Sequence, residues 1–432
     1  MHFKYLCGLI FKYLSMKNYT HKKKNAKQSN KLELDSFFSK GVEKMRASDI
    51  RDALKLVEGK RIISFAGGLP DPETFPREEI RDIINMLEYS DFSSSFQYGA
   101  TLGMIGLRKE LANFVSKRGI INVDEDNILV SAGSQEAIYI LCFLLLNPGD
   151  DIIVEAPTYV AALNAMRLKN PVLHGIPLKN NGMDIEELER ELKEIEAKGR
   201  KIKFIYTIPS SQNPSGITMS MENRKKLLKI AEEHNILIIE DDAYGFLGFD
   251  GDTPDAIKSL DTNGRVIYTS TFSKILAPGF RLGWVVANPE IILKMELLKQ
   301  SIDLHSSTFT QRIALETLRR GVIERNIPKV RKLYKEKRDV MVKSIRRWFP
   351  KDVKYRVPNG GMFIFVWLDS RIDTRELLPE AVKRGVAFVP GAGFYHDDSG
   401  KNTMRLNFSQ PSIREIEEGI KVLGTLIKDK AV

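Results

Sequence analysis

Cysteine and long apolar runs are both scarce in this sequence. Its 432 residues include only Cys7 and Cys142, which lie far apart and form no metal-binding spacing. Such scarcity is typical of a reducing compartment, so we expect a cytoplasmic protein without a disulfide framework. No run approaches the roughly 18 apolar residues that a membrane-spanning helix needs, so we expect no membrane partner.

Acidic residues are absent from the first 30 positions, which carry seven lysines. The net charge of the whole chain is +10, so most of the excess lies in this tail and the rest is close to neutral. A nearly neutral body argues against a nucleic-acid partner. The apolar part of the tail is interrupted by Lys12 and lacks a small-residue cleavage site. It therefore favours a disordered tail, or translation from Met16, over a signal peptide.

Apolar runs of strand length alternate with helical patterns from about residue 100. They are continuous runs rich in Val and Ile, which is typical of strands buried on both faces. Six such runs lie at 127–133, 151–157, 203–209, 236–242, 265–270 and 283–288. Helical patterns such as 220–235 separate them. The alternation predicts an α/β fold with a mostly parallel sheet covered by helices.

A different pattern begins after about residue 310. Long charged helices, including 312–349, precede two strand candidates at 361–369 and 403–409, which together indicate a smaller α+β domain. We therefore predict four parts: a tail (1–30), an arm joining the small domain (31–75), a large cofactor-binding domain (76–310) and a small domain (311–432). The ligand site is expected at the carboxyl ends of the large domain's strands.

Polar residues follow the run 127–133 at the start of an apolar helix. Ser134 and Gln135 stand where free backbone N–H groups suit a phosphate. The alternative is that Ser134 simply caps the helix. Glu136 is expected to point outward and to complement the helix dipole.

Polar residues also follow the next runs. Asn213 precedes a proline after 203–209, where a plain turn is the alternative. Asp241 ends 236–242, and Tyr244 follows three residues later. Although Asp241 has acidic neighbours, no histidine lies nearby, so we expect no metal site.

The run 265–270 leads into a segment that carries a lone lysine, Lys274, with Arg281 seven residues beyond it. Thr271 and Ser273 are the hydroxyl residues beside it. Such a lysine is a solvated loop residue, a phosphate ligand or a group that forms a covalent bond.

Taken together, these residues predict a site for pyridoxal 5′-phosphate. Lys274 supplies the amine for a Schiff base, and burial lowers its pKa so that it acts as nucleophile and base. Asp241 lies against the pyridine nitrogen, while Asn213 and Tyr244 hydrogen-bond the ring oxygen. The predicted phosphate ligands are Ser134, Gln135, Thr271, Ser273 and Arg281.

The order and spacing of "SSQNPSG", "EDDAYGFL" and "STFSKILAPGFRLGW" resemble those of class I aminotransferases of the aspartate-aminotransferase fold type. The resemblance covers nearly the whole chain after about residue 40. It implies that Tyr159 in "EAPTYVAAL" stacks on the cofactor ring. It also implies that Tyr98 in "FQYGATLG" reaches the phosphate of a neighbouring subunit, in a homodimer that shares its active sites. The alternative for both tyrosines is a half-buried core or interface aromatic.

Substrate contacts are implied by the same resemblance. Arg405 in "TMRLNFS" resembles the arginine that binds the substrate α-carboxylate, and Gly68 in "SFAGGLPDPETFP" belongs to a flexible segment that closes over substrate. Arg51 in "DIRDALKL" resembles an arginine that contacts the substrate side chain. The alternative for Arg405 is a surface residue on a strand, and the alternative for Gly68 is a simple turn. The alternative for Arg51 is a solvated arginine on a helix.

Several segments, including "HSSTFTQ", are most similar to kynurenine/α-aminoadipate and archaeal aromatic aminotransferases. This similarity implies aromatic, kynurenine or α-aminoadipate amino donors, 2-oxoglutarate as acceptor and ping-pong kinetics. Two other functions remain open. One is a β-lyase on the same fold. The other is a regulator with an aminotransferase-like sensor domain, although only about 40 residues precede the resemblance and they show no helix-turn-helix pattern.

Overall fold

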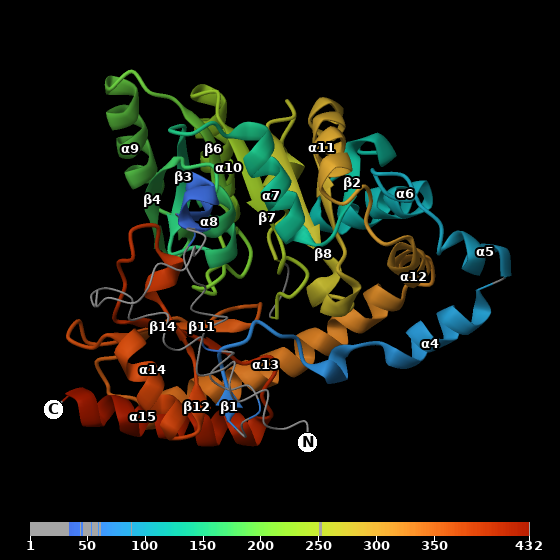
Figure 1. Ribbon diagram of the computed structural model, residues 1–432. Helices are drawn as coiled ribbons and strands as arrows, with labels where there is room; N and C mark the ends of the chain where they lie inside the picture. Colours follow the sequence, from blue (N-terminus) through green and yellow to red (C-terminus); the bar gives the residue numbers. More distant parts are fainter. Residues whose placement is uncertain are drawn as a thin grey trace, which may run out of the picture. The chain divides into compact units, whose positions relative to one another are not determined.

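The structure is a computed structural model that describes residues 34–43, 45, 53, 59, 62–87, 89–249 and 253–431. Contacts divide the chain into two units, Met1–Glu43 and Lys44–Val432. Within the first unit, the described elements are the short helices η2 (Leu34–Phe37) and α2 (Lys40–Glu43). All further elements belong to the second unit, and Figure 1 labels the larger ones.

A mixed sheet of eight strands forms the centre of the large domain. Its order is β2 (Ile128–Ser131), β9 (Gly283–Val286), β8 (Val266–Thr271), β7 (Leu237–Asp241), β6 (Ile202–Thr207), β3 (Asp151–Ala156), β4 (Val172–Lys179) and β5 (Gly182–Met183). β9 runs antiparallel to both neighbours and β5 to β4, while the other pairs are parallel. All six apolar runs form strands, which confirms the predicted fold class.

Helices cover both faces of this sheet because alternate strand residues point to opposite sides. Ile153 and Ile205 belong to an apolar cluster with α9 (Ile185–Ala197) and α10 (Met221–Glu233). The neighbouring strand residues Val154 and Phe204 belong to the main core cluster. That cluster also contains residues of α7 (Ser134–Leu145) and α8 (Val160–Arg167). α6 (Ile105–Phe114) and α11 (Pro289–Ile302) pack near β2 at one end of the sheet.

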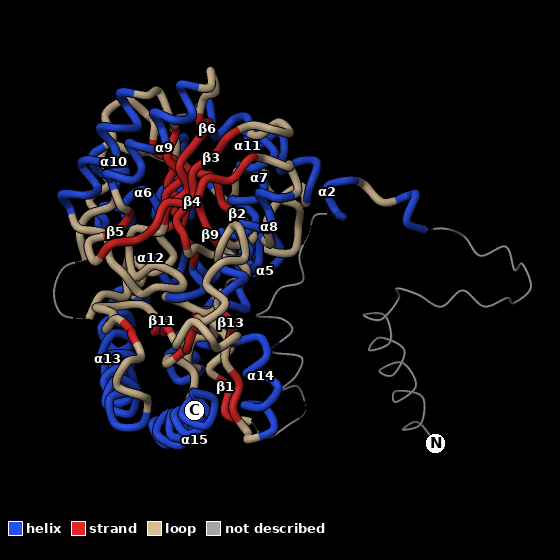
Figure 2. Tube along the Cα trace, turned by 90° about the vertical axis from the view of Figure 1, so that its left-hand side faces the viewer, coloured by secondary structure: helices blue, strands red, loops and turns tan. Residues whose placement is uncertain are grey.

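A second, antiparallel sheet forms the smaller domain. Its order is β10 (Lys354–Tyr355), β11 (Phe363–Trp367), β14 (Thr403–Asn407) and β13 (Val389–Pro390), which confirms the two predicted strands. Beside it, β1 (Ile63–Ser64) pairs in parallel with β12 (Val386–Ala387). α14 (Thr374–Lys383) and α15 (Ile413–Ala431) complete this domain. Figure 2 shows the strands of the two sheets as separate groups.

The range 312–349 contains parts of two helices. α12 (Thr308–Arg319) and α13 (Val322–Trp348) are separated at Gly321, whose φ of 62° lies in the left-handed region that favours glycine. α12 packs against α4 (Arg77–Met86), which α5 (Tyr89–Ser94) follows in the chain. None of the described helices is long and apolar enough to span a membrane. The boundaries at residues 30, 75 and 310 remain predictions.

Candidate active site

A cavity of about 720 Å³ lies at the carboxyl ends of the central strands, where residues of the two domains meet. It brings together residues that are far apart in the sequence. Its predicted members are Gly68, Ser134, Gln135, Tyr159, Asn213, Asp241, Tyr244, Thr271, Ser273, Lys274, Arg281 and Arg405. The other lining residues are Leu69, Gly133, Ile208, Ala243, Pro278 and Phe363.

Lys274 ends the single-turn helix η7 (Phe272–Lys274), which directly follows β8. Its Nζ donates a hydrogen bond to the Gly68 carbonyl oxygen (2.8 Å). Burial, together with the positive charges of Arg405 and Arg281, lowers the pKa of Lys274 to about 8. A neutral amine is therefore present near physiological pH, as a nucleophile or base requires.

Asp241 ends β7 with its carboxyl group turned toward the cavity. Its Oδ2 accepts a hydrogen bond from the hydroxyl of Tyr206 (2.7 Å), whereas Oδ1 is buried and has no partner among the described residues. Burial raises the pKa of Asp241 to about 7, and the nearby charges of Asp242 and Glu155 contribute. An unpartnered buried oxygen of this kind is suited to an N–H group of a ligand.

The two acids beside Asp241 point away from the cavity, because neighbouring side chains of a strand alternate between faces. The Asp242 carboxylate accepts from Arg118 Nε (2.8 Å), and the Glu240 carboxylate lies 3.7 Å from Arg224 Nη1. The acidic run therefore supplies a single carboxyl group to the cavity.

An anion cradle surrounds the start of α7. Its backbone begins at Gly133, with a φ of 88°, and Ser134 follows as the first helical residue. Arg281 Nη2 donates to the Ala132 carbonyl oxygen (3.2 Å), so the guanidinium lies against this turn. A Cβ atom at Gly283 would lie 2.6 Å from Ser134 N, so only glycine permits this approach of β9. Free N–H groups beside a guanidinium suit a phosphate.

Hydroxyl and amide groups complete the cradle. Thr271 Oγ1 lies 2.9 Å from Ser273 Oγ and accepts the Ser273 backbone N–H (3.1 Å). Gln135 donates through Nε2 to the Ala161 carbonyl oxygen (3.1 Å), and its buried Oε1 has no partner among the described residues. These groups face the same cavity as Lys274.

Arg405 lies buried on β14 and lines the cavity from the smaller domain. It donates to Asn213 Oδ1 (2.9 Å) and to the Ala66 carbonyl oxygen (3.0 Å), and its Nε has no partner in the described part of the chain. The rings of Phe363 and Phe394 lie 4.2 and 5.1 Å from its guanidinium carbon. Burial lowers its pKa to about 10. A buried guanidinium without a carboxylate partner favours binding of an anionic ligand.

Asn213 and Tyr244 are neighbours in the cavity wall. A hydrogen bond joins the Tyr244 hydroxyl to the Asn213 side chain, while burial raises the pKa of this tyrosine. Tyr159 lines the wall just before α8 begins. The structure thus places all three predicted ring contacts on one cavity.

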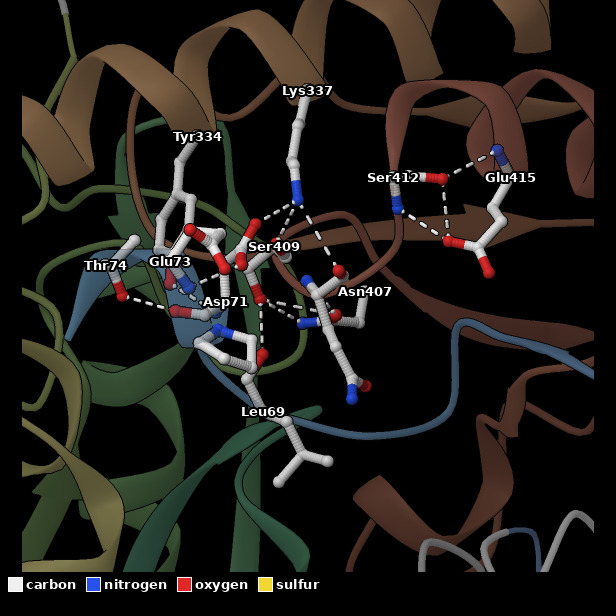
Figure 3. A network of polar contacts seen from close by, with 12 residues as sticks. Leu69, Asp71, Glu73, Thr74, Tyr334, Lys337, Asn407, Ser409, Ser412 and Glu415 are labelled. Carbon is white, nitrogen blue, oxygen red and sulfur yellow. Dashed lines mark hydrogen bonds and ion pairs between the residues drawn. The ribbon is translucent and has the colours of Figure 1, made fainter. Parts of the chain in front are cut away.

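Residues 66–71, which include the cavity-lining Gly68 and Leu69, are named the cover segment here. Lys337 of α13 donates to the Asp71 carboxylate and to the Ser409 carbonyl oxygen (2.8 Å), and Ser409 Oγ donates to the Leu69 carbonyl oxygen (2.8 Å). Figure 3 shows this network of buried polar contacts. The cover segment is therefore fixed to the same domain that carries Arg405.

One predicted residue lies elsewhere. Tyr98 does not line the cavity; it is 78% exposed and packs edge-on against His305, with ring centroids 5.7 Å apart. Its contact with a neighbouring subunit stays a prediction. Arg51 lies outside the described residues.

The expectation for Glu136 is wrong. Its side chain is only 11% exposed, and its Oε2 accepts from Ala132 N–H (2.6 Å) and from Lys299 Nζ (2.8 Å). The cause is tertiary, because a buried lysine on α11 offers a partner that the local sequence does not reveal.

Sequence reasoning also missed Tyr206 and Phe363. Tyr206 pairs with Ile239 across β6 and β7, and Ile239 points to the same face of the sheet as Asp241. The register of these two strands could therefore have placed Tyr206 beside Asp241. Phe363 comes from the other domain, and no local pattern marks it as a cavity residue.

Comparison with known proteins assigns the family. Residues 62–423 match the family described as Aminotransferase class I and II. An uncharacterized aminotransferase of Saccharolobus solfataricus is 53% identical over 91% of this chain and 98% of its own length. Aromatic-amino-acid aminotransferase 1 of Thermococcus litoralis is 45% identical over 92% of this chain and 96% of its own length.

A solved structure agrees with this assignment. The kynurenine aminotransferase of Pyrococcus horikoshii, described in complex with PMP, is 47% identical, with a TM-score of 0.88 over 93% of this chain and 99% of its own. The architecture is the aspartate-aminotransferase fold type that the sequence predicted. The chain belongs to the class I and II aminotransferase family.

Proposed function

We propose that the protein is a pyridoxal-phosphate-dependent aminotransferase. It moves the amino group of an aromatic, kynurenine or α-aminoadipate-type amino acid to a 2-oxo acid, with 2-oxoglutarate as the acceptor. The observation that carries this proposal is one cavity that holds an amine with a pKa of about 8, a carboxyl group and a buried arginine. Among the described residues, one oxygen of that carboxyl group has no partner and the arginine has no carboxylate partner.

The cavity residues fit pyridoxal phosphate. When bound, this cofactor supplies an aldehyde that condenses with amines and a protonated ring that stabilises the electrons of a broken Cα–H bond. The free Oδ1 of Asp241 suits the pyridine N–H, and the cradle at Ser134 and Arg281 suits the phosphate. Tyr159 lines the wall where a ring face can stack.

The protein's own groups then have distinct tasks. Arg405 binds the α-carboxylate of the amino acid and so orients its Cα–H bond. Lys274, with its lowered pKa, accepts the Cα proton as a base and later returns it as an acid. Asn213 and Tyr244, which are joined by a hydrogen bond, would hold the ring oxygen of the bound cofactor. The same groups serve both half-reactions, which is why we expect ping-pong kinetics.

The donor assignment rests on the relatives and on the cavity wall. Relatives are described as aromatic-amino-acid and kynurenine aminotransferases. Leu69 and Phe363 give the wall beside Arg405 an apolar character that suits an aromatic side chain. The α-aminoadipate donor rests on the sequence resemblance.

A homodimer and a cytoplasmic location complete the proposal. Several large apolar side chains of the large domain are exposed: Met86, Phe96, Tyr98, Ile105, Leu293, Leu297 and Leu304. Exposed apolar side chains of this size are suited to burial against a second copy. The cytoplasmic location rests on the two cysteines.

Product analysis tests the reaction. The purified protein, supplied with pyridoxal phosphate, is incubated with phenylalanine, kynurenine or α-aminoadipate, with and without 2-oxoglutarate. We expect glutamate and the matching 2-oxo acid to form in equal amounts, and only when 2-oxoglutarate is present. Ammonia release without an added 2-oxo acid would instead support the β-lyase, and absence of any product would favour a binding role on this fold.

A further inference from the structure

Glu136 stands in the first turn of α7, directly behind the two residues that line the anion cradle. Ser134 and Gln135 contact the cavity, and Glu136 is the next residue of the helix. Its carboxylate is turned inward, where Oε2 accepts the Ala132 backbone N–H (2.6 Å). The Ala132 carbonyl oxygen in turn accepts from Arg281 (3.2 Å), so the backbone entering the cradle is held at both its N–H and its C=O.

Lys299 approaches Glu136 from α11 and is completely buried. Its Nζ donates to Glu136 Oε2 (2.8 Å) and to both carboxylate oxygens of Asp303 (2.9 and 2.8 Å). Asp303 is the more exposed acid, at 28% against 11% for Glu136. Glu136, Lys299 and Asp303 are called the Lys299 cluster below.

A carboxylate in the first turn of a helix is favourable by itself because the helix N-terminus carries partial positive charge. It is unfavourable when a phosphate binds the same terminus, since two negative groups then repel each other across a buried region of low dielectric. Glu136 nevertheless supplies the hydrogen bond that holds Ala132. Lys299 reduces this conflict, because its positive charge offsets that of Glu136 without removing that bond, while Asp303, the second acid that it contacts, is the more exposed of the two.

We propose that Lys299 is a positioning residue for phosphate binding, acting by neutralising Glu136 behind the cradle. The proposal rests on the proposed function, since the phosphate is that of pyridoxal phosphate. It assigns to Lys299 a role that the cavity lining does not reveal, because Lys299 itself does not touch the cavity.

Binding measurements separate this role from a purely structural one. Lys299→Met leaves the Glu136 carboxylate without its cation, and we expect the affinity of this variant for pyridoxamine 5′-phosphate at pH 8 to fall roughly tenfold or more. Binding of pyridoxamine, which lacks the phosphate, should change much less. Glu136→Gln/Lys299→Met removes both charges and should restore the affinity for pyridoxamine 5′-phosphate to near the wild-type value.

Glu136→Gln alone keeps a side-chain oxygen for Ala132 N–H and leaves Lys299 charged. It should bind pyridoxamine 5′-phosphate as tightly as wild type or several-fold more tightly. This variant keeps the test decisive if Lys299→Met does not fold. Weaker binding by Glu136→Gln would contradict the proposal.

The remaining outcomes are also decisive. Equal losses for pyridoxamine and its phosphate in Lys299→Met, or no recovery in the double variant, would assign Lys299 to structure alone. If wild type binds pyridoxamine 5′-phosphate and Lys299→Met binds it equally well, the inference fails while the proposed function stands. If wild type does not bind pyridoxamine 5′-phosphate, the proposed function fails first.

Discussion

At the scale of single residues, the chemistry depends on the lowered pKa of Lys274. The neutral amine is the form that attacks an aldehyde, and its fraction increases as the pH rises through about 8. We expect the rate at which cofactor-free protein takes up pyridoxal phosphate to rise with pH and to reach a plateau above this midpoint. Stopped-flow absorbance at a series of pH values measures this rate.

The charge of Arg405 contributes to that midpoint. Arg405→Met removes a positive charge that disfavours the ammonium form, so the midpoint should move to higher pH. Arg405→Lys keeps the charge and is the matched control, with a smaller shift. A midpoint that stays unchanged in Arg405→Met would show that the charge of Arg405 does not contribute to the lowered pKa of Lys274.

Asp241 should make the cofactor-free protein less stable at higher pH. Its pKa is raised to about 7 by burial, so the folded protein holds this proton more tightly than the unfolded chain does. The free energy of unfolding therefore falls as the pH rises from about 4 to about 7, by roughly 2–4 kcal/mol for this group. The free energy of unfolding of Asp241→Asn should not fall in this way, because an amide does not titrate.

Urea unfolding of cofactor-free wild type and Asp241→Asn at pH 5 and pH 8 tests this. The variant should gain in stability relative to wild type between the two pH values. Tyr206→Phe serves as a contrast, because it removes the hydrogen bond to Asp241 Oδ2 and should lower stability by about 1–2 kcal/mol. A constant difference between wild type and Asp241→Asn would mean that Asp241 titrates normally.

At the scale of elements, the cover segment depends on the buried pair Asp71 and Lys337. Lys337→Met leaves the Asp71 carboxylate without its cation and should lower the free energy of unfolding by about 3–5 kcal/mol. Because the pair also positions the cover segment, we expect the KM for the amino donor to rise as well. Urea unfolding and steady-state kinetics measure the two effects.

Asp71→Asn/Lys337→Met is the matched control, since it leaves no unpaired charge. It should recover much of the stability while the KM stays raised, because the ionic contact that holds the cover segment is still missing. Recovery of both quantities together would mean that the pair stabilises the fold without positioning the cover segment.

Elements with strong apolar patterns could be predicted from the sequence, and weakly patterned ones could not. The six continuous Val/Ile runs form strands because burial on both faces requires apolar residues at every position. β4 was missed because its sequence, "VLHGIPLK", contains Gly, Pro and polar residues and is only half buried. The break between α12 and α13 depends on the left-handed backbone at Gly321, which the charged helical pattern obscures.

In the candidate site, too, some residues could be predicted from the sequence and others could not. Residues that end strands, such as Asp241 and Lys274, could be placed because the carboxyl ends of parallel strands meet at one edge. The partners of those residues could not. The Gly68 carbonyl at Lys274, Tyr206 at Asp241 and Lys299 at Glu136 come from distant segments, and only the packing of the chain brings them together.

At the scale of the whole molecule, the exposed Tyr98 predicts active sites shared between two subunits. Tyr98→Ala and Lys274→Ala should each have low activity alone. A mixed dimer has one site with both an intact Lys274 and the partner's intact Tyr98. After unfolding and refolding an equal mixture, we expect activity of about a quarter of the wild-type value, because half of the dimers are mixed and each has one intact site.

The control is a mixture of wild type with Tyr98→Ala that is unfolded and refolded in the same way. It measures how much activity survives the refolding. Mass from light scattering shows whether dimers form. If the mixture of Tyr98→Ala and Lys274→Ala has no more activity than its components, Tyr98 does not serve a neighbouring subunit's site.

The central claim is that Lys274 carries pyridoxal phosphate in a reversible amino-transfer cycle. The most direct test is the near-ultraviolet and visible absorbance of the purified protein, before and after glutamate and then 2-oxoglutarate, compared with Lys274→Ala. We predict that wild type shows a cofactor band that shifts with glutamate and returns with 2-oxoglutarate, and that Lys274→Ala does not complete the cycle. The same reversible cycle in Lys274→Ala, or no band in wild type after added pyridoxal phosphate, would contradict the account.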